Sequence, residues 1–145
     1  MRELPRKLTA DELAELFEGR TRLVERLAGV EDPLEAAPDL ARQVPEDEVL
    51  EALSAHPAIG AKGLSARSAR EQGSDEDAAT EAELADLNRA YEEKFGFRFV
   101  VFVNNRPKTA ILPILRERLR RTRAEELETA LSELVAIARD RWQNQ

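Results

Sequence analysis

Apolar residues recur every three or four positions along most of this chain, and this spacing limits the fold more than any other feature of the sequence. The clearest case is the stretch from about Ala124 to Trp142. Its apolar positions are Leu127, Leu131, Leu134 and Ala138. Because steps of three and four residues follow one face of an α-helix, we expect most of the chain to be helical.

Local signals mark where the helices of the first half begin. Thr9 followed by Glu12 has the spacing of a capping box, in which two side chains satisfy the free N–H groups of a helix start. Asp32 followed by Pro33 has the order of an N-cap and a first-turn proline. Pro45 is expected to start a further helix.

The second half shows the same pattern with one interruption. A stripe beginning near Thr80 ends at Gly96, and glycine is the usual residue just past a helix end. The stripe consists of Leu84, Leu87, Tyr91 and Phe95. Helical spacing resumes near Thr109, although Pro113 suits only the first turn of a helix.

One stretch, FRFVVFV (97–103), is rich in the aromatic and β-branched residues typical of strands. No partner strand is evident in the sequence, so we interpret it as a buried extended connector. The fold class expected is therefore all-α. We predict one compact domain over residues 1–145, with about seven or eight helices of the usual length of ~11 residues.

Composition excludes several functional classes. Acidic residues outnumber basic ones by 29 to 22, and the net charge of −7 argues against nucleic acid or an anionic membrane as the main partner. The absence of cysteine and the single histidine leave only carboxylates as further metal ligands, so no metal site is expected. Neither a GxSxG elbow nor a Gly-rich phosphate loop is present.

The N-terminal stretch MRELPRKLTADEL lacks the apolar centre of a secretory signal. No apolar run approaches the ~20 residues of a membrane span. We therefore expect a cytoplasmic protein.

Two polar residues fall on helix faces that are otherwise apolar. Asn88 lies on the Tyr91 stripe, and Arg141 continues the last stripe, whereas Arg139 points roughly 160° away at ~100° per residue. Asn88 can serve as a structural hydrogen-bonding residue between helices. Arg141 can be a solvated cation that favours the helix dipole. The pattern alone leaves the structural and functional interpretations open.

The only histidine, His56, stands where a helical stretch ends, directly before Pro57. Imidazole ordinarily titrates near pH ~6.5, which suits proton transfer near neutrality, but a histidine here can also cap the preceding helix. Ser68, Glu71 and Gln72 share a face if their stretch is helical, and they can equally form an exposed polar turn.

Several stretches, taken in order, resemble the family of 2-oxo-4-hydroxy-4-carboxy-5-ureidoimidazoline (OHCU) decarboxylases. They are LFEGRTRLVERLA (16–28), HPAIG (56–60), SAREQ (68–72), LNRAYEEKFGFRFVVFV (87–103), RERLRR (116–121) and ALSELVAIARDRW (130–142). One such motif is weak, but together in register they are specific and cover nearly the whole chain. Arg20-Thr21-Arg22 departs from the SPW common in the family, and the stretches after His56 and Gln72 look shorter.

The resemblance implies an all-helical, cofactor-free and often dimeric enzyme that converts OHCU to (S)-allantoin in urate degradation. His56 would be the acid–base group, and Glu71 would bind the substrate hydroxyl and orient His56. Ser68 and Gln72 would donate and accept hydrogen bonds at the ring amides.

The remaining expected substrate contacts come from three separate places in the chain. Pro57 would fix the backbone after the histidine, and Arg141 would offer a planar fork to a carboxylate or a carbonyl pair. Backbone groups of the connector would line the substrate at Val101, Phe102, Val103, Asn104 and Asn105. Shortened loops leave open a relative that acts on another ureido acid.

A non-enzymatic helical interaction domain is the other alternative. It would treat His56, Glu71 and Arg141 as scattered surface groups. An enzyme instead requires His56, Glu71 and Gln72 to converge on one pocket.

Overall fold

The computed structural model describes residues 3–57 and 78–144. These residues form seven α-helices and no strand, which confirms the all-α prediction for this part of the chain. The helices are α1 (Ala10–Leu16), α2 (Arg22–Leu27), α3 (Pro33–Gln43), α4 (Glu46–Ser54), α6 (Ala78–Phe95), α7 (Lys108–Arg118) and α8 (Arg123–Gln143). None of them is long and apolar enough to cross a lipid bilayer.

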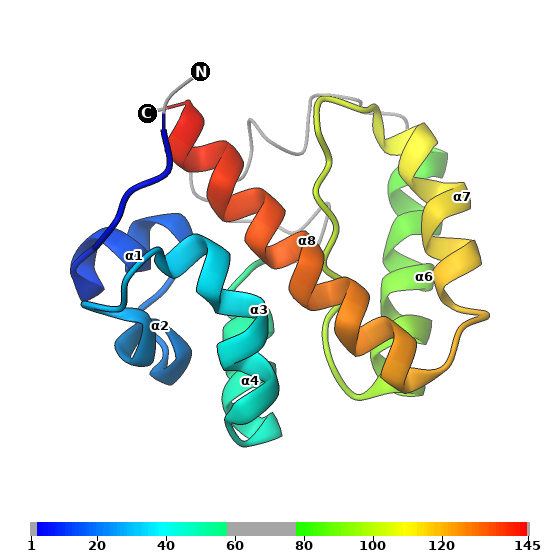
Figure 1. Cartoon of the computed structure of the whole chain (residues 1–145). Helices are drawn as coiled ribbons and strands as arrows, with labels where there is room; N and C mark the ends of the chain where they lie inside the picture. The colour runs from blue at the N-terminus through cyan, green and yellow to red at the C-terminus, as the bar shows by residue number, and fades with distance from the viewer. Residues whose placement is uncertain (1–2, 58–77, 145) are drawn as a thin grey trace. The chain divides into compact units, whose positions relative to one another are not determined.

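Contacts within the chain divide it into two compact units. Unit 1 consists of Met1–His56 together with Thr129–Gln145, and unit 2 of Pro57–Glu128. Helices α1 to α4 therefore belong to unit 1, α6 and α7 belong to unit 2, and α8 contributes residues to both (Figure 1). Each unit has buried apolar residues of its own, so the single domain over residues 1–145 stays a prediction.

Helix starts in unit 1 follow the local signals of the sequence. The Thr9 hydroxyl accepts from the Glu12 N–H at 3.1 Å, and the Glu12 carboxylate accepts from the Thr9 N–H at 3.0 Å, which confirms the capping box. Asp32 precedes α3 and Pro33 is its first residue, as expected. The Asp32 side chain makes no capping bond, because its backbone is left-handed (φ 50°), and its N–H donates to the Arg6 carbonyl at 2.7 Å.

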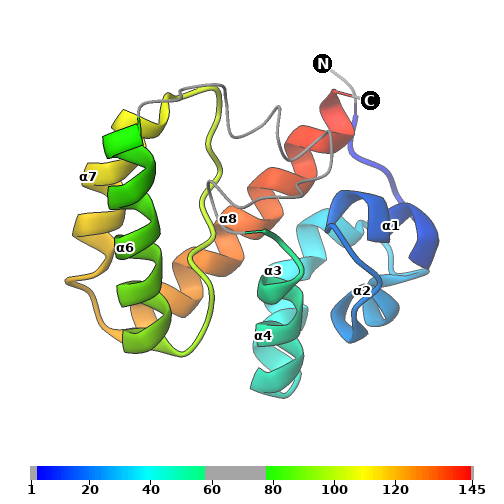
Figure 2. The same cartoon turned by 180° about the vertical axis from the view of Figure 1, so that it is seen from behind.

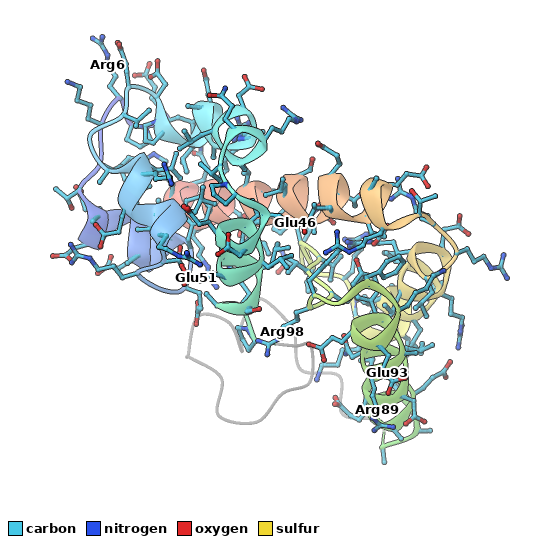
Figure 3. The ribbon with its side chains drawn as sticks, turned by 90° about the horizontal axis from the view of Figure 1, so that it is seen from below. Arg6, Glu46, Glu51, Arg89, Glu93 and Arg98 are labelled. Carbon is cyan, nitrogen blue, oxygen red and sulfur yellow. The ribbon has the colours of Figure 1, made fainter. Side chains whose placement is uncertain are left out.

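Charged side chains join α2 to α4 at the edge of unit 1. Arg26 donates twice to the buried Glu48 carboxylate, with Nε–Oε1 at 2.5 Å and Nη2–Oε2 at 2.9 Å. Because this guanidinium bonds the ionised form, the pKa of Glu48 lies below its ordinary value. Glu51, on the side of α4 that faces α2 in Figure 3, accepts from the Arg22 N–H at 2.7 Å.

Leucines and alanines of five helices form the core of unit 1. Its fully buried members include Leu13, Leu16, Leu23, Leu27, Leu34, Leu53, Leu134 and Ala138. The α8 stripe expected from the sequence is therefore buried where it belongs to unit 1. Pro45 lies at the N-cap of α4, one residue before the helix begins.

Helices α6 and α7 lie side by side in unit 2 (Figures 1 and 2). Helix α6 ends at the predicted place, since Gly96 adopts the left-handed backbone (φ 78°) that follows many helices. Its outer face is charged and exposed, and Arg89 and Glu93 stand there one turn apart (Figure 3).

The core of unit 2 is centred on Tyr91, the only tyrosine of the chain. Its ring centroid lies 4.6 Å from that of Phe95, 5.9 Å from Phe97 and 5.3 Å from Phe99. The last two rings belong to the extended connector, which holds no strand over 97–103. The connector is thus buried by its aromatic side chains, as predicted.

Pro113 lies inside α7 and not in its first turn, the only place where the sequence led us to expect a proline. The helix begins at Lys108 and continues through Pro113 to Arg118. An interior proline costs about 3 kcal/mol because it removes a backbone hydrogen bond. Burial of Ile111 and Leu115 on the same helix offsets this cost, since each fully buried side chain contributes about 1.5–3 kcal/mol.

Candidate functional site

The residues expected to bind substrate fall in three places. His56 and Pro57 follow α4, Arg141 lies in the last turn of α8, and 101–105 form the end of the connector in unit 2. Ser68, Glu71 and Gln72 lie outside the described residues. Convergence of His56, Glu71 and Gln72 on one pocket therefore stays a prediction.

His56 lies two residues beyond Ser54, the last residue of α4, and is buried. The residue is 6% exposed, and its backbone N–H donates to the Leu53 carbonyl at 3.3 Å. Because the residue directly before a proline disfavours the helical backbone, Pro57 keeps α4 from continuing through His56. The imidazole is thus held inside the folded chain, next to a residue whose backbone is rigid.

Arg141 is buried at 3% exposure, whereas Arg139, two positions earlier, is exposed. The interpretation of Arg141 as a solvated cation is therefore wrong. Helical geometry explains the difference, because two residues are ~200° apart around the axis and only Arg141 continues the buried stripe of α8.

The Arg141 guanidinium is held by the end of α1. Its Nη1 lies 2.7 Å from the Glu18 carboxylate and donates at 3.4 Å to the carbonyls of Glu15 and Leu16. Carbonyls at a helix end lack partners within the helix, so a buried cation finds acceptors there. Glu18 itself has a left-handed backbone (φ 65°). Glu18 was not predicted from the sequence, where it stands between Phe17 and Gly19.

The proposed substrate-facing end of the connector closes in a tight turn. The Arg106 N–H donates to the Val103 carbonyl at 3.1 Å, and Asn104 (φ 51°) and Asn105 (φ 63°) both have left-handed backbone. Two such central residues define a type I′ turn, which asparagine tolerates better than most residues. The Arg106 side chain also donates to the carbonyls of Val103 (2.9 Å) and Phe102 (2.5 Å).

A buried polar cluster that is bonded to the connector through Arg118 was also not predicted from the sequence. Glu126 accepts from the Tyr91 hydroxyl at 2.6 Å, from Arg118 Nε at 2.7 Å and from Arg121 Nη1 at 3.1 Å. Burial, and next the bond to Glu126, raise the pKa of Tyr91 above its ordinary value. Arg118 could have been found as Arg141 was, because it shares one helix face with buried Ile111 and Leu115.

Asn88 is buried on α6, as the Tyr91 stripe predicts. A surface hollow of about 510 Å³ lies along α7 and is lined by Pro113, Ile114, Glu117, Arg118 and Arg121. It contains none of the residues expected to touch substrate. In the part of the chain that the structure describes, no three acidic or histidine side chains come together as metal ligands would.

Comparison with known proteins gives a consistent result. The family model for OHCU decarboxylase matches residues 2–143. The uric acid degradation bifunctional protein PucL of Bacillus subtilis is 30% identical over 97% of this chain. A putative 2-oxo-4-hydroxy-4-carboxy-5-ureidoimidazoline decarboxylase of Homo sapiens is 37% identical over 76% of it. The chain spans 31% of the length of the first protein and 58% of the second.

A solved structure shares the fold. The crystal structure of an OHCU decarboxylase in the presence of (S)-allantoin superposes with a TM-score of 0.73 at 28% sequence identity. The match covers 90% of this chain and 94% of that one. The likeness thus covers nearly all of this chain.

Proposed function

The chain belongs to the OHCU decarboxylase family, and on that premise we propose that it decarboxylates OHCU to (S)-allantoin without metal or organic cofactor. The observation that carries the proposal is the match of the family model over residues 2–143. It is supported by the burial of His56 and Arg141, the two described side chains to which the proposal assigns polar roles.

The substrate itself can accept the electrons that decarboxylation releases, so the reaction needs no cofactor for that purpose. The OHCU carboxylate sits on a ring carbon that also bears a hydroxyl group, and the ring contains conjugated imine and carbonyl functions. When the C–C bond to the carboxylate breaks, carbon dioxide leaves and the electron pair passes into the conjugated ring. A proton then adds to one face of the ring, and the face chosen sets the S configuration.

We assign the roles residue by residue. His56 moves the proton, and Glu71 binds the substrate hydroxyl and orients the imidazole. Ser68 and Gln72 hold the ring amides. Arg141 binds a carboxylate or carbonyl pair with a guanidinium whose direction is set by Glu18.

Backbone groups also belong to this proposed site. Pro57 stiffens the chain after the histidine, and the peptide groups of Val101 to Asn105 line the substrate. An extended segment suits this role because its N–H and C=O groups are not consumed by a helix.

Further properties follow as proposals from the family and the composition. The substrate is a small anion, neither nucleic acid nor a membrane is a partner, and the protein is a cytoplasmic homodimer. The absence of cysteine agrees with a reducing compartment. Light scattering of the purified chain tests the dimer directly.

The decisive experiment adds the purified chain to freshly generated OHCU and follows allantoin by absorbance and circular dichroism. We expect allantoin to form faster than by spontaneous decay, with the optical sign of the S enantiomer. Decay at the uncatalysed rate, or a racemic product, rules the proposal out and favours a helical interaction domain.

A further inference from the structure

The guanidinium of Arg118 lies in the interior of unit 2, although arginine is among the residues least often buried. The residue is 5% exposed and shares one face of α7 with buried Ile111 and Leu115. A cation in such a place must be matched by acceptors, because removing it from water without partners costs several kcal/mol. Its acceptors therefore show what the residue holds in place.

Arg118 connects a carboxylate to the connector. Its Nε donates to Glu126 Oε1 at 2.7 Å, and its Nη1 donates to the Val100 carbonyl at 2.7 Å. The guanidinium carbon lies 4.6 Å from the centroid of the Phe99 ring. A planar fork makes these contacts together, whereas the point charge of lysine does not reproduce them.

Glu126 anchors this fork from the other side. It is 0% exposed and accepts from Tyr91, Arg118 and Arg121 at 2.6, 2.7 and 3.1 Å. Three donors on one buried carboxylate leave it little freedom to rotate, because a lost bond strands a charge in the interior. The position of the Arg118 fork is thus defined by groups on α6 and α8.

The bond to Val100 has a directional consequence. Because the peptide between Val100 and Val101 is planar and trans, its C=O and its N–H point in opposite directions. Arg118 fixes the C=O and thereby aims the Val101 N–H away from the buried cluster. Arg106 does the same two peptides further on, where its bond to the Phe102 carbonyl fixes the direction of the Val103 N–H.

We propose that Arg118 is a positioning residue, which holds the Val100–Val101 peptide so that the Val101 N–H faces the substrate. The inference rests on the proposed function, in which the backbone of Val101 to Asn105 lines the substrate. No strand pairs with the connector within the described residues, so side chains set its peptide directions. Arg118 acts through the backbone and does not touch the substrate itself.

The test compares Arg118→Lys with Arg121→Lys. Both variants keep the charge and both remove a guanidinium from Glu126, but only the first removes the bond to the Val100 carbonyl. We expect Arg118→Lys to fold and to lose about 10- to 100-fold in kcat/KM, since a misplaced contact group costs up to about 100-fold. Arg121→Lys is expected to stay within about twofold of the wild type, because its bond is longer and its side chain is partly exposed.

A second readout does not depend on activity. Amide hydrogen exchange at Val101 and Phe102 is expected to quicken in Arg118→Lys and to stay unchanged in Arg121→Lys. If the wild type does not act on OHCU, the proposed function fails. In that case, exchange that quickens in Arg118→Lys but not in Arg121→Lys still supports the inference that Arg118 fixes the Val100–Val101 peptide. Unchanged exchange in Arg118→Lys overturns that inference.

A purely structural role gives a different result. If Arg118→Lys lowers the melting temperature but keeps wild-type kcat, KM and exchange, positioning by Arg118 is disproved. Should that variant not fold, Tyr91→Phe replaces it, because it removes one donor from Glu126 and keeps the ring. A smaller loss of kcat/KM in the same direction supports the proposal, and unchanged kinetics in Tyr91→Phe overturns it.

Discussion

Buried Arg141 forms an ion pair with the partly exposed Glu18, although the two residues lie more than a hundred positions apart. Such a pair is weak evidence for stability, because the cost of removing both charges from water offsets their attraction. It does define the direction of the guanidinium. A buried arginine with a fixed direction is suited to bind a planar anion, which is the role proposed for it.

At this position we predict that lysine does not replace arginine. Arg141→Lys should lose about 10- to 100-fold in kcat/KM, the range of one or two lost hydrogen bonds to a charged group. Arg139→Lys is the matched control, since Arg139 lies exposed on the same helix, and it should be nearly silent. Steady-state kinetics on both, with folding checked by circular dichroism, decides the question. Equal losses would show that the role assigned to Arg141 is wrong.

A second prediction at the residue scale concerns His56. His56→Asn should reduce turnover by about 10²- to 10⁴-fold, the usual contribution of a general acid–base group. Asparagine is smaller than histidine but keeps a polar side chain of similar branching, so the folded state should persist, and the melting temperature serves as the control. A folded His56→Asn protein with wild-type turnover would sink the mechanism.

At the scale of elements, unit 2 is built around a connector that has no strand partner among the described residues. Helix α6 supplies Tyr91, α7 supplies Arg118 and α8 supplies Glu126, and the three meet behind the Phe99 ring. Aromatic packing buries the connector, and arginines satisfy its carbonyls. A short segment in a helical protein is thereby held in one conformation.

The buried hydrogen bond between Tyr91 and Glu126 leads to a prediction about stability at alkaline pH. Burial, followed by the bond to Glu126, raises the folded-state pKa of Tyr91. The protonated hydroxyl therefore stabilises the folded state fully below the pKa of tyrosine in the unfolded chain, which is about 10, and this contribution declines as the pH rises above that value. Because Tyr91 is the only tyrosine, tyrosinate absorbance reports on it alone. Native protein should titrate above the midpoint seen in urea. Coincident midpoints in native and unfolded protein would contradict the buried bond.

At the scale of the whole molecule, the acidic net charge of −7 contrasts with the anionic substrate proposed. The chain must therefore bind an anion with a few arginines placed at the site and not with its overall field. Several of its arginines form exposed ion pairs with carboxylates, such as Arg6 with Glu31 and Arg20 with Asp11. Such exposed pairs contribute little to stability.

Metal removal tests the molecule as a whole. With no cysteine and one histidine, the chain offers only carboxylates besides His56 as metal ligands, so activity should survive exhaustive chelation. The measurement is the rate of allantoin formation before and after treatment with a chelator, with zinc and magnesium added back as the control. Loss of activity that a specific divalent ion restores would overturn the cofactor-free proposal.

Helix positions were predictable from the sequence because their causes are local. The capping box at Thr9, the proline after Asp32 and the glycine at 96 act within one turn of the chain, and the structure confirms all three helix boundaries. The inward direction of Arg141 was predictable for the same reason, since helical register relates it to residues three or four positions away. The interior proline of α7 was not, because core packing outweighed a local preference.

Only the tertiary structure decided which buried polar groups meet. Periodicity shows that Arg118 and Arg141 face inward, but it does not show that one binds Glu126 and a connector carbonyl while the other binds Glu18. A buried charge needs a partner, and the chain path alone brings that partner near. The sequence by itself therefore determined the helices and their inward faces. The tertiary structure decided which acceptors the buried arginines bind, because a buried charge needs a counter-charge and only the folded chain brings one near.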